Sequence, residues 1–115
     1  MKEYLMLIRE NLENYEKMTP EEMQKDIEKH VKWVEQIAKN GNFKDGNPLM
    51  PAGKHIKGKD KLVTDGPYIE VKEGISGFYF LLANSLEEAT EIAKGCPSLE
   101  SGGTLEIREM IQTGQ

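Results

Sequence analysis

The chain has 115 residues, of which 37% are hydrophobic and 30% charged, and its formal net charge is −5. This length predicts a single domain, residues 1–115, that is large enough to bury a core. The negative charge argues against nucleic acid as a partner, because a phosphate backbone would be repelled. No apolar run approaches the roughly 20 residues of a membrane helix, so we expect a cytoplasmic protein without a membrane partner. Cys96 is the only cysteine, which excludes an internal disulfide.

The first part of the chain predicts a strand followed by a long helix. Residues 4–8 form a short apolar run of strand length, and we expect the acidic stretch 10–16 to be a connecting loop. Thr19 is the predicted N-cap of the helix, Glu22 completes a capping box, and Gly41 ends the helix. Apolar residues recur between these points at helical spacing: Met23, Ile27, Val31, Trp33, Val34, Ile37 and Ala38.

The second part predicts two strands, a helix and a last strand. Residues 43–51 are rich in Gly, Asn and Pro, and we place the second strand after them, at residues 54–64 around a bend. Its lysines suit a sheet edge, whose open backbone is commonly protected by charge. An apolar strand is predicted at 78–83. A second capping box starts a helix over 85–93, and the alternation of residues 104–110 predicts the closing strand.

The order βαββαβ predicts an α+β, ferredoxin-like domain, in which two helices cover one face of a four-stranded antiparallel sheet. Residues 4–8 and 78–83 are apolar at odd and even positions alike. Two helices can cover only one face of these strands, so the other face would expose a large apolar patch. A second subunit is the simplest cover, and we therefore expect a homodimer.

One segment carries a family resemblance. Residues 64–73 read Thr-Asp-Gly-Pro-Tyr-Ile-Glu-Val-Lys-Glu and lead into the strand at 78–83. This pattern resembles the signature of the YCII-related family in its DGPF form, with Tyr68 where the family usually has Phe. The resemblance extends over nearly the whole chain and implies a dimeric α+β barrel, in which two sheets pack face to face across a two-fold axis. It leads to a family whose members mostly lack an assigned reaction.

Asp65 is the first candidate catalytic residue. A carboxylate at a strand end, held by a Gly-Pro turn, can act as an acceptor or general base, or it can simply cap the turn. The residues that follow could orient a polar ligand, or they could form a solvated loop of mixed charge. These candidate ligand-binding residues are Tyr68, Glu70, Lys72 and Glu73.

His30 is the second candidate catalytic residue, and it lies on or beside the apolar stripe of the long helix. Its residue type and position fit a partly buried, hydrogen-bonded side chain. The family resemblance implies instead a His–Asp site that includes this histidine. Where those proteins have Asp-Pro after the second helix, this chain has Cys96-Pro97, so Asp65 is the substitute carboxylate. We expect Cys96 itself to be a packing residue, since a helix C-terminus raises a thiol pKa.

Two classes of function are consistent with these residues. The first is a small-molecule enzyme with acid/base chemistry, supplied by Asp65 and His30 in a pocket near the dimer interface. The second is a non-catalytic dimeric module that binds a ligand or serves in regulation. The sequence has no metal-ligand spacing and no phosphate-binding glycine loop, so neither a metal nor a cofactor is predicted.

Overall fold

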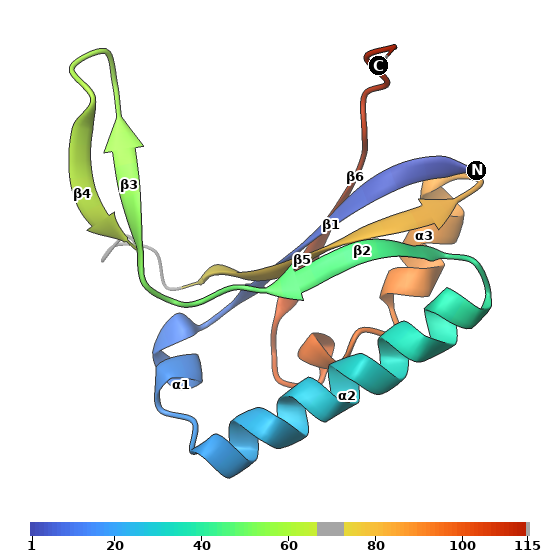
Figure 1. The fold of residues 1–115 in the computed structure, drawn as a ribbon, viewed down its shortest axis with the longest axis horizontal. Coiled ribbons are helices and arrows are strands. Elements are labelled where there is room, and N and C mark those ends of the chain that lie inside the picture. Colours follow the sequence, from blue (N-terminus) through green and yellow to red (C-terminus); the bar gives the residue numbers. More distant parts are fainter. Residues whose placement is uncertain (67–72, 115) are drawn as a thin grey trace.

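The computed structural model of the protein describes residues 1–66 and 73–114, shown in Figure 1. The strands in these ranges are β1 (Lys2–Glu10), β2 (Phe43–Pro48), β3 (Gly53–Lys57), β4 (Leu62–Gly66), β5 (Gly74–Ala83) and β6 (Thr104–Glu109). The helices are α1 (Leu12–Glu16), α2 (Pro20–Lys39), α3 (Leu86–Ala93) and the short 3-10 helix η1 (Pro97–Leu99).

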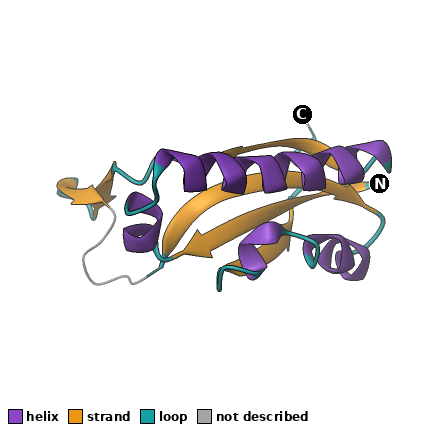
Figure 2. Cartoon of the chain, turned by 90° about the horizontal axis from the view of Figure 1, so that it is seen from below, coloured by secondary structure: helices purple, strands orange, loops and turns teal. Residues whose placement is uncertain are grey.

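Four of the strands form an antiparallel sheet in the order β2-β5-β1-β6. The long helix α2 and the shorter α3 lie on one side of this sheet (Figure 2). Strands β3 and β4 pair only with each other, and their hairpin projects away from the sheet (Figure 1). The α+β, ferredoxin-like fold predicted from the sequence is confirmed. Within the described ranges, no helix is long and apolar enough to cross a membrane.

The second strand of the sheet is not where the sequence predicted it. Residues 54–64 supply the hairpin, and β2 occupies the sheet edge beside β5. Gly46 and Pro48 make β2 a poor strand by propensity, but both are tolerated on an edge strand. Gly46 is also required by packing, because a Cβ atom at this position would collide with the Tyr79 ring. Tertiary contacts therefore outweigh the local composition.

The predicted loop at 10–16 is also wrong in part, because it contains the short helix α1. The Asn11 side chain accepts hydrogen bonds from the backbone N–H groups of Glu13 and Asn14 and so caps this helix. Leu12 is buried and holds α1 against the sheet. The two longer helices begin as predicted: Thr19 and Ser85 each accept a hydrogen bond from the backbone N–H three residues later.

The two faces of the sheet are both apolar, as predicted, but the helices of the described residues cover only one of them. On the helix side, Tyr4, Met6 and Leu81 are fully buried and form the core with residues of α2 and α3. On the opposite side, β1 and β5 pair large apolar residues directly across the strands. These pairs are Leu5 with Phe80 and Leu7 with Phe78, and all four side chains are half-buried, as is Leu82.

The buried side of α2 is rotated from the predicted stripe. Trp33 and Ile37 are buried in the core, whereas Ile27 and Val31 remain 40% and 49% exposed. The backbone turn of about 100° per residue places His30 on the same side as Trp33 and Ile37. The apolar stripe of α2 therefore serves two purposes: part of it closes the core, and part of it faces a cavity.

Candidate functional site

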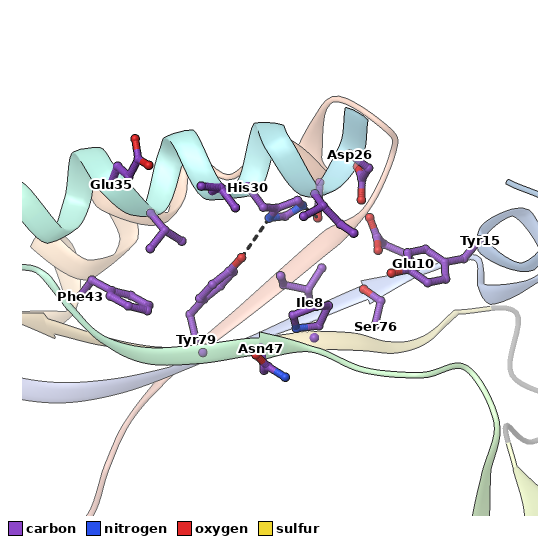
Figure 3. Close-up of a pocket in the computed structure, with 17 residues that line it drawn as sticks. Ile8, Glu10, Tyr15, Asp26, His30, Glu35, Phe43, Asn47, Ser76 and Tyr79 are labelled. Carbon is purple, nitrogen blue, oxygen red and sulfur yellow. Dashed lines mark hydrogen bonds between the residues drawn. The ribbon is translucent and has the colours of Figure 1, made fainter. Parts of the chain in front are cut away.

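A cavity of about 280 Å³ lies between α2 and the sheet (Figure 3). This volume is just below the range of roughly 300–1,000 Å³ that is usual for small-molecule pockets. Elements far apart in the sequence contribute its walls: β1, α1, α2, β2, β5 and η1. Much of the wall is apolar, with Ile8, Ile27, Val31, Val34 and Phe43 among the lining residues.

His30 lies in the wall of this cavity and is held at both ring nitrogens. Its Nδ1 atom is 3.1 Å from the Tyr79 hydroxyl oxygen, and its Nε2 atom is 3.2 Å from Ser98 Oγ. The His30 and Tyr79 rings also stack, with centroids 6.2 Å apart and 20° between their planes. In the neutral ring one nitrogen donates and the other accepts, and in the imidazolium form both donate to the two hydroxyl oxygens. The site therefore accommodates either charge state of the imidazole.

Tyr79 is the buried neighbour that fixes this arrangement. Its ring meets those of Trp33 and Phe43 edge to face, with centroids 5.4 and 6.1 Å away. Burial is the main cause that raises the pKa of Tyr79 to about 12, and electrostatic interactions with Cys96 and Asp26 contribute to the same shift. The Tyr79 hydroxyl is therefore protonated at neutral pH and acts as a hydrogen-bonding group.

Cys96 and Ser98 lie at the start of η1, and Ser98 contacts the imidazole. Both side chains are buried, and Ser98 lines the cavity whereas Cys96 belongs to the core. Burial raises the pKa of the Cys96 thiol, and hydrogen bonds with Ser98 lower it by a smaller amount. A thiol with a raised pKa is a weak nucleophile. The buried position agrees with the prediction that Cys96 is a packing residue.

The cavity is acidic at its margin. Figure 3 shows Glu10 and Asp26 near Tyr15 and Ser76, whereas Glu35 lies toward the end that holds Phe43. Burial raises the pKa of Tyr15, and the charges of Asp26 and Glu10 raise it further. Glu10 and Asp26 therefore act electrostatically on Tyr15, which lines the cavity.

The YCII-related domain model matches residues 3–113, a range that includes every element of the cavity. The chain belongs to the YCII-related family. The resemblance predicted from the sequence is thereby confirmed over nearly the whole chain. None of the curated proteins compared with the chain matches it. Membership of the YCII-related family identifies the domain and leaves its reaction to be inferred from the site.

The structure does not bring the two predicted catalytic residues of this YCII-related domain together. Asp65 lies at the end of β4, opposite Lys54 of β3, and its carboxylate forms an ion pair with that lysine. The Asp65 side chain is 86% exposed and does not line the cavity of His30. A catalytic role for Asp65 stays a prediction that this geometry does not support.

Of the four predicted ligand-binding residues, only Glu73 lies within the described residues. Glu73 lies just before β5, where its carboxylate accepts a hydrogen bond of 3.4 Å from Thr104 Oγ1, and it does not line the cavity. Tyr68, Glu70 and Lys72 lie outside the described residues. The binding roles given to these four residues stay predictions.

Sequence reasoning missed Tyr79 and Ser98 as partners of His30. A signal for Tyr79 was present, because a tyrosine within an apolar strand needs a partner for its hydroxyl once it is buried. Ser98 gave no such signal, since its partner lies 68 residues away in the chain. Serine beside a proline is ordinary at the start of a turn or short helix.

Proposed function

We propose that this YCII-related domain is a small-molecule enzyme in which His30 is the general acid and base. The observation that supports this most directly is the double hydrogen bonding of His30, to Tyr79 and Ser98, in the wall of an apolar cavity. Histidine is the side chain whose charge ordinarily changes between about pH 5 and 8, and a fixed ring orientation is what proton transfer requires.

The hydrogen bonds provide a route for one proton. When Nε2–H donates to Ser98 Oγ, Nδ1 accepts from the Tyr79 hydroxyl. A substrate carbon or oxygen acid can then release a proton to the Tyr79 oxygen while Tyr79 passes its own proton to Nδ1. The resulting imidazolium donates to both hydroxyl oxygens. Return of the proton to another substrate atom completes an isomerisation, and its transfer to a leaving group completes an elimination.

The alternative is a binding module without catalysis. One observation favours it: within the described residues, the hydrogen-bond partners of the His30 ring are two hydroxyl groups and no carboxylate. A His–Asp site would use a carboxylate to stabilise the imidazolium. A ligand that stabilises the protein against heat and undergoes no proton exchange would support this second function.

Proton exchange with solvent tests the enzymatic function before a product is known. Small molecules that raise the melting temperature are incubated with the protein in D₂O, and ¹H NMR follows the loss of substrate C–H signals. We expect His30→Gln to slow this exchange by roughly 10²–10⁴-fold, the usual contribution of general acid–base catalysis. Glu28→Gln, on the exposed side of the same helix, is the control. Equal exchange in His30→Gln and wild type would refute the proposal.

We also infer that the protein is a homodimer that covers the open sheet face. Leu5, Leu7, Phe78 and Phe80 form the apolar centre of that face, and ion pairs such as Lys44–Glu3 lie at its margin. Phe80→Glu should therefore give a monomer of 13.0 kDa by light scattering. Ile56→Glu on the hairpin should leave the dimer intact.

A cytoplasmic location stays a prediction.

A further inference from the structure

The charge of the cavity wall indicates which ligands the proposed site selects. Its lining includes the acidic residues Glu10, Asp26 and Glu35 and, among the described residues, no lysine or arginine. The whole chain has 15 lysines and arginines against 20 aspartates and glutamates. Negative charge is therefore far more dominant in the lining than in the chain as a whole. None of the three carboxylates forms an ion pair with a described residue.

One end of the cavity also contains the hydroxyl group of Ser76. Ser76 is 5% exposed, and its side chain makes no hydrogen bond to the part of the chain that the structure describes. The backbone oxygen of Ser76 accepts a hydrogen bond of 2.8 Å from the backbone N–H of Leu49, which follows β2. Figure 3 shows the Ser76 side chain on the cavity side of β5, below Glu10. Because Ser76 lines the cavity, its hydroxyl oxygen is available to a polar group of a ligand.

We propose that the cavity selects small molecules with an ammonium group on an apolar body. Glu10 and Asp26 accept charge-assisted hydrogen bonds from the ammonium group, and Ser76 Oγ accepts a further one. The apolar body lies along Val31 and Val34, which places its carbon atoms beside His30. This assignment rests on the function proposed above and adds the chemical class of its substrate.

An apolar wall strengthens both the attraction of a ligand to opposite charges and its repulsion by like charges. A cation near two unpaired carboxylates is stabilised more in a cavity of low dielectric constant than in water. The Tyr15 ring, at the same end of the cavity, adds a face that attracts a cation. An anionic ligand of the same shape meets uncompensated negative charge, so the cavity discriminates by charge more than by size.

Three probes of matched size test the proposal: 2-phenylethylamine, 2-phenylethanol and 3-phenylpropionate. Binding is measured at pH 7 by NMR titration of the labelled protein, with the signals of His30 and Ser76 reporting the cavity. We expect the amine to bind at least tenfold more tightly than the carboxylate, with the alcohol between them. The amine should lose affinity as sodium chloride is raised, because salt screens the carboxylates.

Variants then locate the ammonium group. The double variant Glu10→Gln with Asp26→Asn keeps the side-chain shapes, and we expect it to weaken the amine at least tenfold while the alcohol is unchanged. Glu28→Gln, on the same helix and outside the cavity, should bind all three probes as wild type does. Equal binding of amine and carboxylate, or an unchanged amine affinity in the double variant, would overturn the ammonium assignment and leave the cavity as a site. Failure of all three probes at millimolar concentration would overturn the assignment and the proposed site together.

Discussion

The β3–β4 hairpin and strand β5 both carry apolar side chains on antiparallel strands, yet their environments are opposite. In the hairpin Leu62 is 61% exposed, and Asp65 forms an ion pair with Lys54 across the strands. In β5 Tyr79 is 7% exposed and contacts Trp33 and His30. The helix α2 covers β5 and does not cover the hairpin (Figure 1). Burial beneath a helix, more than the prominence of a sequence motif, places polar groups where they can act together.

The largest expected difference between the two regions is in stability. Tyr79→Ala should lower the free energy of unfolding by about 3–5 kcal/mol, because it removes a buried aromatic ring from the core. Leu62→Ala on the hairpin should change it by no more than about 0.5 kcal/mol, as is usual for exposed positions. Urea unfolding measures both. Similar losses in the two variants would show that the hairpin is packed in solution.

Ser98→Ala tests the hydrogen bond that fixes His30 from behind. We expect a loss of about 1–2 kcal/mol in the free energy of unfolding, since a buried hydroxyl and one partner of the imidazole are removed. Ser101→Ala, at an exposed position just after η1, is the matched control. NMR titration of His30 distinguishes a positioning role from packing alone. An unchanged His30 titration curve would contradict the role of Ser98 in holding the ring.

The raised pKa of Tyr79 predicts a loss of stability in alkali. An unfolded tyrosine loses its proton near pH 10, whereas folded Tyr79 keeps it to about pH 12. Between these pH values only the unfolded state is ionised, so the contribution of Tyr79 is complete below pH 10 and falls as the pH rises to 12. Urea unfolding of wild type and Tyr79→Phe over this range measures it. Wild type should lose stability more steeply, and parallel curves would refute the shift.

Asp65 supplies the smallest expected effect. Its pair with Lys54 is exposed, and such pairs contribute about 0–1 kcal/mol. Asp65→Asn should therefore leave the free energy of unfolding and probe binding within error of wild type, whereas His30→Gln should change probe binding at the cavity. Loss of binding in Asp65→Asn, with the melting temperature kept, would restore Asp65 as a functional residue and shift the site toward the hairpin.

The sequence by itself determined the features that depend on near neighbours. Thr19 and Ser85 begin their helices because a side-chain oxygen and a backbone N–H three residues away satisfy each other locally. The apolar runs at 4–8 and 78–83 predicted the two central strands, and their two-sided character was correct. The family signature extended these local patterns to the whole chain.

Only the tertiary structure decided the edge of the sheet and the site. β2 was not predicted because glycine and proline disfavour strands locally, while the Tyr79 ring makes Gly46 necessary there. His30, Tyr79 and Ser98 meet across separations of 49 and 68 residues, and no local pattern records such contacts. Asp65 lies in the more conspicuous sequence motif. Cavity walls, however, form where helices pack over a sheet, and that packing depends on the whole domain.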